Sequence, residues 1–278
     1  MVEVDFPAGD AASIGAAWFA IWARVRDERE LAIRAGAALA RPTSVVLLVA
    51  CLVDREERGL STRLALESGW TTWEELARAA RFGEIARDHR REIVHARMFD
   101  LEGARRAADT VADALERRVP SLSPSVLRLI RFVFEELCAK VVQHSTAPRT
   151  GVGWADVDPA AGLFTLGVTD CGVGILASLQ RNPELASRVE DDAAALRLAI
   201  LPGISGAGPS RRNMGFGLKA LVELSDVLDA ELRISSGTAR LTRRTIVGRR
   251  ENRTEAIPNW RGTSIELEAR LSADVLGR

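Results

Sequence analysis

The chain has 278 residues, of which 47% are hydrophobic and 27% charged, enough to bury one sizeable core or two smaller ones. Lys and Arg together number 38, as do Asp and Glu, so the formal net charge of +0 favours neither nucleic acid nor an anionic membrane as a bulk partner. The cysteines Cys51, Cys138 and Cys171 have no CxxC spacing, which argues against a disulfide framework and a structural zinc site.

The N-terminal sequence and the apolar runs bear on localisation. The first ten residues, MVEVDFPAGD, are acidic and lack the basic and apolar regions of a signal peptide. The longest apolar run, residues 45–53, is far too short to cross a bilayer. We therefore expect a cytoplasmic protein.

Residues 1–88 alternate strand-like and helix-like segments, which predicts a smaller N-terminal α/β domain. Ser13 is a candidate N-cap and Gly59 a candidate C-cap of two of the helices. The expected strands are residues 2–6, 31–35 and 60–66, and the expected helices are residues 13–28, 42–59 and 72–82.

A charged stretch, ARDHRREIVHAR, marks the expected domain boundary. It is either a linker, taken here as residues 89–100, or an exposed strand. The second domain, residues 101–278, should contain three helices, five strands and a long irregular region over residues 172–212. Its expected helices are residues 102–118, 123–144 and 216–228, and its expected strands are residues 153–157, 163–169, 231–235, 241–247 and 262–267.

The sequence Asp170-Cys171-Gly172-Val173-Gly174-Ile175 follows directly after an expected strand. A carboxylate at a strand end can face a cavity and accept a hydrogen bond from an exocyclic amine such as that of adenine. Glycines in this turn allow unusual φ values and let a ligand approach the backbone. A tight turn capped by the aspartate explains the same residues, so the motif alone leaves both interpretations open.

The sequence Gly215-Phe216-Gly217-Leu218 opens an expected apolar helix. Free backbone N–H groups and the helix dipole at such a start favour an anion, and phosphate is the natural occupant. The spacing matches neither a P-loop nor a dinucleotide fingerprint, and a structural turn is the alternative.

The segment LRLIRFVFEELCAKVVQHS is an amphipathic helix with Glu136 and Lys140 beside its apolar stripe. A glutamate near a nucleotide can orient or deprotonate water. The alternative is an ordinary i,i+4 surface pair. The stripe consists of Leu127, Ile130, Phe134, Leu137 and Val141.

The order of these segments over residues 100–272 resembles the GHKL superfamily, which contains type II topoisomerases, sensor histidine kinases, mismatch-repair ATPases and anti-sigma serine kinases. The resemblance implies a Bergerat ATP-binding fold. This is a two-layer α/β sandwich with a mixed, mostly antiparallel sheet and helices on one face. ATP would lie between the layers, under a lid formed by residues 176–214.

The resemblance also implies roles for particular residues. The segment FEELCAKVVQHS looks like the N box, with Glu136 as general base, and DCGVGI looks like the first glycine box, with Asp170 accepting a hydrogen bond from adenine. The segment GFGL looks like the second glycine box, at the phosphates. The segment GTSIELE looks like the last box, with Thr263 near adenine. The implied ATP-binding residues are Lys140, Asp170, Gly172, Gly174, Ile175, Gly215, Phe216, Gly217, Leu218 and Thr263.

One position departs from the family pattern. Lys140 stands where the N box has an asparagine that holds Mg²⁺. A charged lysine has three donors and no acceptor, so it cannot ligate a metal. Its ammonium can replace part of the metal's charge on the phosphates, or pair with Glu136. The sequence therefore predicts ATP binding and leaves Mg²⁺ use and hydrolysis open.

Residues 1–88 are similar to a STAS-like domain, in which a Ser or Thr at the start of the central helix can be phosphorylated. Thr43 and Ser44 stand near that place, although an N-cap role explains them equally well.

Three functions follow from these observations. The first is an ATP-dependent regulatory switch acting on a protein partner. The second is an active ATPase or anti-sigma-type serine kinase that uses Glu136, and the third is a degenerate module that works only through protein contacts. A histidine kinase is not favoured, because no histidine lies in a recognisable dimerisation hairpin. The sequence does not identify the partner, and it does not distinguish a monomer from a homodimer.

Overall fold

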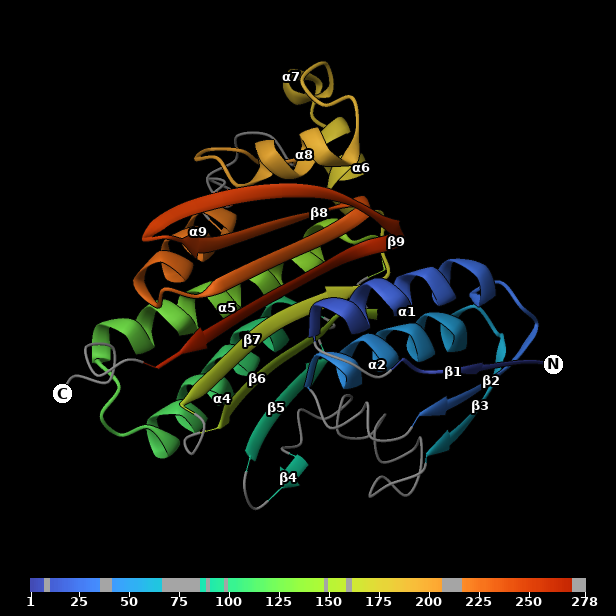
Figure 1. The fold of residues 1–278 in the computed structure, drawn as a ribbon, viewed down its shortest axis with the longest axis horizontal. Coiled ribbons are helices and arrows are strands. Elements are labelled where there is room, and N and C mark those ends of the chain that lie inside the picture. Colours follow the sequence, from blue (N-terminus) through green and yellow to red (C-terminus); the bar gives the residue numbers. More distant parts are fainter. Residues whose placement is uncertain are drawn as a thin grey trace.

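A computed structural model describes residues 1–7, 11–35, 42–66, 86–88, 91–97, 100–147, 150–158, 162–206 and 217–271. Within these residues the chain forms a small sheet, a large sheet and the helices that cover them (Figure 1). The α/β class expected from the sequence is confirmed.

The N-terminal part is a parallel three-stranded sheet with strand order β1-β2-β3. Parallel neighbours need a crossover connection, which α1 and α2 supply. Gly59, with φ of 68°, follows α2 as a C-cap residue should. The expected helix at residues 72–82 lies outside the described residues. The elements are β1 (Val2–Asp5), α1 (Ala11–Val25), β2 (Glu30–Ala35), α2 (Pro42–Glu57) and β3 (Ser61–Leu66).

The large sheet has the strand order β4-β5-β6-β7-β9-β8, and every described pairing in it is antiparallel. A mixed sheet was expected, but the described parallel pairings all belong to the small sheet. The proposed linker also contains a strand of this sheet, since β5 pairs with β6 from Glu92–Val157 to Arg97–Val152. The strands are β4 (Ala86–Asp88), β5 (Arg91–Arg97), β6 (Val152–Asp158), β7 (Leu163–Asp170), β8 (Glu231–Ile246) and β9 (Arg249–Arg270).

The C-terminal strands differ from the prediction of three short ones. They are the two long arms of one hairpin, joined at Val247 and Gly248, whose φ values are 48° and 72°. The predicted break near residue 237 is a β-bulge instead, because Gly237 has φ of 58° and the register shifts on both sides of it. A bulge lets a strand bend and continue, so a glycine there does not end it.

Helices cover both faces of the large sheet, although helices on one face were expected. Successive residues of a strand point to opposite faces, and on β6 Ala155 joins the main core while Trp154 joins a second core. The main core lies under α4 (Leu101–Arg118), α5 (Pro124–His144) and α9 (Gly217–Val227). The second core lies under α1 and α2 (Figure 1). The N-terminal part therefore packs on the face that a two-layer sandwich would leave open.

The region from residue 172 to 206 is helical rather than irregular. It contains α6 (Gly174–Gln180), α7 (Pro183–Ala186) and α8 (Asp192–Ala199), which enclose a small apolar cluster of their own. Side-chain caps start two of these helices, since Asn182 accepts a hydrogen bond from Glu184 N and Asp191 accepts one from Ala194 N. Such short helices carry too few turns for apolar periodicity to reveal them.

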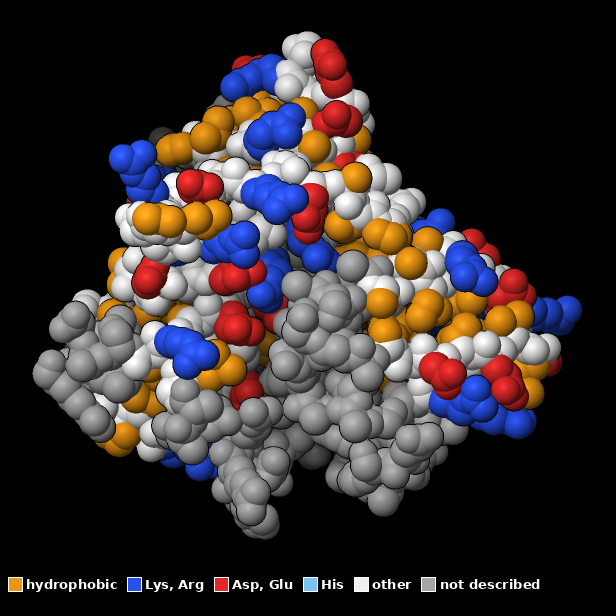
Figure 2. Space-filling view, viewed as in Figure 1, with side chains coloured by type: hydrophobic (Ala, Val, Ile, Leu, Met, Phe, Trp, Pro, Cys, Tyr) orange, Lys and Arg blue, Asp and Glu red, His pale blue; other side chains and the backbone are white. Residues whose placement is uncertain are grey.

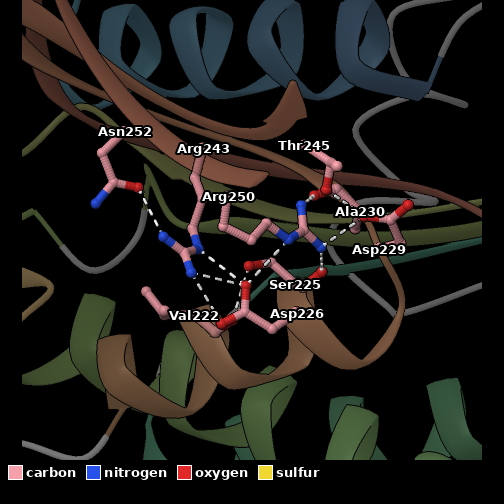
Figure 3. Close-up of polar contacts among 9 residues, drawn as sticks. All are labelled: Val222, Ser225, Asp226, Asp229, Ala230, Arg243, Thr245, Arg250 and Asn252. Carbon is pink, nitrogen blue, oxygen red and sulfur yellow. Dashed lines mark hydrogen bonds and ion pairs between the residues drawn. The ribbon is translucent and has the colours of Figure 1, made fainter. Parts of the chain in front are cut away.

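Two hairpin arginines hold the C-terminal end of α9 (Figure 3). Arg243 donates to both carboxylate oxygens of Asp226, over 2.8 and 2.9 Å. Arg250 donates to the carbonyl oxygens of Ala230 and Ser225. Cations at a helix C-terminus satisfy its free carbonyls and complement its dipole. The hairpin and α9 are thus joined at the end of α9 far from Gly217.

None of the helices in the described ranges is long and apolar enough to span a membrane.

The packing of α1 on the large sheet can be tested through Trp260. Its ring lies 4.6 Å from the Phe19 ring, centroid to centroid, and it is fully buried. Trp260→Ala should lower the free energy of unfolding by about 3–5 kcal/mol in denaturant titrations. Phe132→Ala is the control, because Phe132 is 44% exposed and should cost far less. A Trp260→Ala effect as small as the control would mean that α1 does not pack there.

Candidate functional site

A pocket opens between α5, the carboxyl end of β7, α6 and the start of α9. Apolar side chains from α5, β7, α6 and β9 form most of its wall, among them Leu137, Val168, Leu179 and Ile265. Several of the residues expected to bind ATP meet there, from four separate segments of the chain. They are Lys140, Asp170, Gly174, Ile175, Leu218 and Thr263.

Asp170 ends β7 and is 5% exposed. Its Oδ1 accepts hydrogen bonds from Ser145 Oγ at 2.9 Å and from Gly172 N at 2.7 Å. Burial raises the pKa of the Asp170 carboxyl to about 6, although these two donors and the Thr263 backbone favour the charged form. A buried carboxylate that lines a cavity and has a raised pKa is a candidate for contact with a ligand.

Thr263 lies directly beside Asp170, because β7 and β9 pair these two residues in register. The close approach depends on Gly262, which has φ of 112° and whose added Cβ would collide with the Asp170 carbonyl oxygen. The sequence motifs predicted that Thr263 lies in the site, whereas Gly262 was not singled out.

The two glycines of the first motif have different roles. Gly174 lines the pocket with φ of 79°, and an added Cβ would lie 2.7 Å from Ser236 Oγ. The hydroxyl of Ser236 accepts a hydrogen bond from Ile175 N at 2.8 Å and so caps the start of α6. Gly172 is not among the residues described as lining the pocket. An added Cβ there would collide with Ser145, so the absence of a side chain at Gly172 lets the turn pack against the end of α5.

Glu136 and Lys140 lie beneath the first residue of α9. A Cβ added to Gly217 would lie 2.5 Å from Lys140 Cε and 3.2 Å from Glu136 Oε2. Burial lowers the pKa of Lys140, and the neighbouring Glu136 charge opposes that shift. The two side chains are half-buried beneath α9 rather than fully exposed on the helix surface. Among the described residues the pocket lining includes Lys140 but not Glu136.

Of the expected phosphate-binding turn, the structure describes Gly217 and Leu218, whereas Gly215 and Phe216 lie outside the described residues.

His144 and Ser145 were assigned no role in the site from the sequence, although both line the pocket. Burial, Lys140 and Arg181 lower the pKa of His144 to about 4, so its imidazole is neutral at pH 7. Helical spacing was the available signal, because residues i and i+4 share a face and His144 lies four positions after Lys140.

The polar groups of the pocket are arranged along α5. Lys140 lies at the end that borders α9, His144 follows one turn later, and Ser145 binds Asp170 at the other end. A rise of 1.5 Å per residue separates the two ends by roughly 7–8 Å. The pocket can therefore hold a ligand with a hydrogen-bond donor at one end, an anionic group at the other and an apolar body between them. In the part of the chain that the structure describes, no group of three His, Cys, Asp or Glu side chains could hold a metal ion.

No protein-family model matches this sequence, and no curated protein matches it either.

The charge of Asp170 should destabilise the protein without ligand. The folded state retains a proton that the unfolded state has already lost between pH 4 and 6, because the folded pKa is about 6 against an ordinary 3.8. This penalty is fully present above pH 6 and disappears as the pH falls through 6 toward 4. Asp170→Asn should therefore raise the free energy of unfolding at pH 7.5 by roughly 1–3 kcal/mol, with a smaller gain at pH 4.5.

Chemical denaturation of both proteins at the two pH values checks this expectation. Asp113→Asn, on the exposed face of α4, is the control and should change the free energy of unfolding by less than about 0.5 kcal/mol. A loss of stability in Asp170→Asn would show that the carboxylate has a structural role in place of a binding one.

Proposed function

We propose that the chain binds an adenine nucleotide, ATP or ADP, in this pocket and acts as a nucleotide-dependent switch on a protein partner. The observation that carries the proposal is the meeting of Lys140, Asp170 and Thr263 in one pocket. These residues come from α5, β7 and β9, and each occupies a position that the GHKL resemblance assigns to ATP. The arrangement of α5, α9 and the antiparallel sheet is also compatible with a Bergerat fold.

The adenine end of the proposed site is the Asp170–Thr263 corner. The exocyclic amine of adenine would donate to the Asp170 carboxylate, whose charge is expensive to bury without such a donor. Val141, Ile175 and Ile265 line the pocket and supply apolar walls for the faces of the base.

The phosphate end of the proposed site is Lys140 and the start of α9. The Cε end of the Lys140 side chain lies against Gly217, where the N–H groups and dipole of α9 also favour an anion. The described residues at this end do not fit Mg²⁺, because Lys140 has no lone pair to offer while it is charged. We therefore propose that nucleotide binds without a metal ion, and we assign no hydrolytic step to Glu136.

A switch requires a ligand that binds two conformations with different affinity. The proposed nucleotide would touch α5, β7 and α6 together. Helix α8, which packs on α6, is in turn tied to the hairpin, since Asp192 accepts hydrogen bonds from Thr238 N and Oγ1 at 2.8 and 2.9 Å. Nucleotide binding can thereby change the surface that α6–α8 present to a partner. A protein partner agrees better than nucleic acid with Figure 2, where basic and acidic side chains are interspersed over the hairpin strands.

Calorimetric titration with ATP, first with Mg²⁺ and then with EDTA, tests the proposal directly. We expect binding of similar affinity in both conditions and no release of inorganic phosphate. Phosphate release that requires Mg²⁺ would support the ATPase alternative. No binding in either condition would leave the module that works only through protein contacts.

Asp170→Asn should weaken ATP binding by about 10–100-fold, because an amide accepts more weakly than a carboxylate and can turn a donor toward the amine. Wild-type affinity should fall as the pH drops below 6, because the protonated acid accepts more weakly than the carboxylate, and the variant should lack this dependence. Titrations across this pH range check both expectations, with Asp113→Asn as control. An unchanged affinity would remove Asp170 from the site.

Lys140→Asn should make nucleotide binding depend on Mg²⁺, because it restores a side-chain oxygen at the position of the cation. Lys140→Met keeps the length of the side chain, removes the charge and should weaken ATP more than adenosine. Equal losses for ATP and adenosine would place Lys140 away from the phosphates.

A further inference from the structure

The tip of the β8–β9 hairpin combines a strained backbone with an exposed apolar side chain. Ile246 pairs with Arg249, so the turn between the strands consists of Val247 and Gly248 alone. Both have positive φ values, 48° and 72°, a conformation in which two-residue turns prefer Asn-Gly. A β-branched residue such as valine is strained there. Val247 gains no packing within the chain in return, because it is 96% exposed.

The surface near this tip exposes two more large apolar side chains. Ile246, next to Val247, is 37% exposed, and Val227, at the end of α9, is 50% exposed. Val227 lies in sequence between Asp226 and Asp229, both of which accept hydrogen bonds from hairpin side chains. Backbone strain at an exposed apolar residue indicates a contact outside the chain, in which that side chain is buried.

An open groove lies directly beside the tip and carries charges of both signs. Asp229 is held there, because its Oδ1 accepts from Thr245 Oγ1 and pairs with Arg250 (Figure 3), yet its side chain is 74% exposed. Arg244 makes no ion pair within the residues that the structure describes. The groove is lined by Asp229, Glu231, Arg244, Thr245, Ile246 and Val247.

The mixed charge of this surface determines what it fits. An anionic lipid surface would attract Arg244 but repel Asp229 and Glu231. A two-fold axis places the same patch against itself, so each Arg244 can face the carboxylates of the other copy while the apolar tips meet at the axis. We propose that the hairpin tip is a contact between two copies of this chain, with Val247 of each copy packed against Val247 of the other. This contact goes beyond the proposed nucleotide function and does not depend on it.

Sedimentation of the full chain over a range of concentrations tests the contact. We expect a monomer–dimer equilibrium, and Val247→Asn should weaken the dimer on the order of 100-fold, because the substitution removes an apolar side chain from both copies. Under dilute conditions, where both proteins are monomers, the same variant should raise the midpoint of thermal unfolding by about 2–4 °C, since asparagine relieves the strain. A misfolded variant would lower the midpoint, so the two measurements distinguish loss of the contact from loss of the fold.

An introduced thiol tests where the axis lies. Cys51, Cys138 and Cys171 are all buried, so Val247→Cys supplies a single exposed thiol. Oxidation should join two copies through position 247, which a non-reducing gel detects, and dithiothreitol should separate them. Ser187→Cys, at the exposed end of α7, is the control and should give no cross-linked dimer at the same concentration.

Several results would overturn the proposal. They are a wild type that stays monomeric at its highest soluble concentration, a dimer that Val247→Asn leaves intact, and equal cross-linking of the two thiol variants. A monomeric wild type that sediments with phosphatidylserine vesicles, when Val247→Asn does not, would assign the tip to an anionic lipid surface instead. None of these measurements uses a nucleotide, so their outcome is independent of whether the pocket binds ATP.

Discussion

The antiparallel pairing of β7 with β9 is the constraint on which the other parts of the site depend. It places Asp170 opposite Thr263 and requires a glycine at position 262, where the two backbones are too close for a side chain. The end of α5 packs on the same turn through Ser145. The charge of Asp170 is consequently buried at a point where three elements meet, and each of them contributes to how it is held.

The N-terminal part packs on the opposite face of the large sheet, behind the strand end that carries Asp170. Trp154 and Trp260 point away from the pocket, into the core shared with α1 and α2. Cys171 belongs to the same core and is adjacent in sequence to Asp170. Opposite faces of one strand end therefore serve the pocket and the contact with the N-terminal part. A displacement of Cys171 in the N-terminal core, or of Asp170 in the pocket, therefore acts directly on the adjacent residue that serves the other face.

Much of this arrangement could be predicted from the sequence, because strong local signals specify it. The apolar stripe of α5 and the glycines after Asp170 predicted a helix and a turn that the structure contains, and the strand expected at residues 163–169 is β7. The prediction was weakest where tertiary contacts decide the outcome. The first half of β9 is charged and includes Pro258, so only its pairing with β8 identifies it as a strand. Short capped helices replaced the irregular region, and nothing local showed that α1 and α2 would cover the sheet. The roles of Gly172 and Glu136 also depended on neighbours that are distant in the sequence.

The arginine contacts at the hairpin have a mechanical consequence for α9. Asp226 and the carbonyls near it fix one end of the helix, while its first residue borders the pocket next to Lys140. A rigid rod held at one end cannot slide along its axis, but it can pivot. Any push on α9 at Gly217 would therefore swing the helix about Asp226, with the largest displacement at the pocket and the smallest at the hairpin.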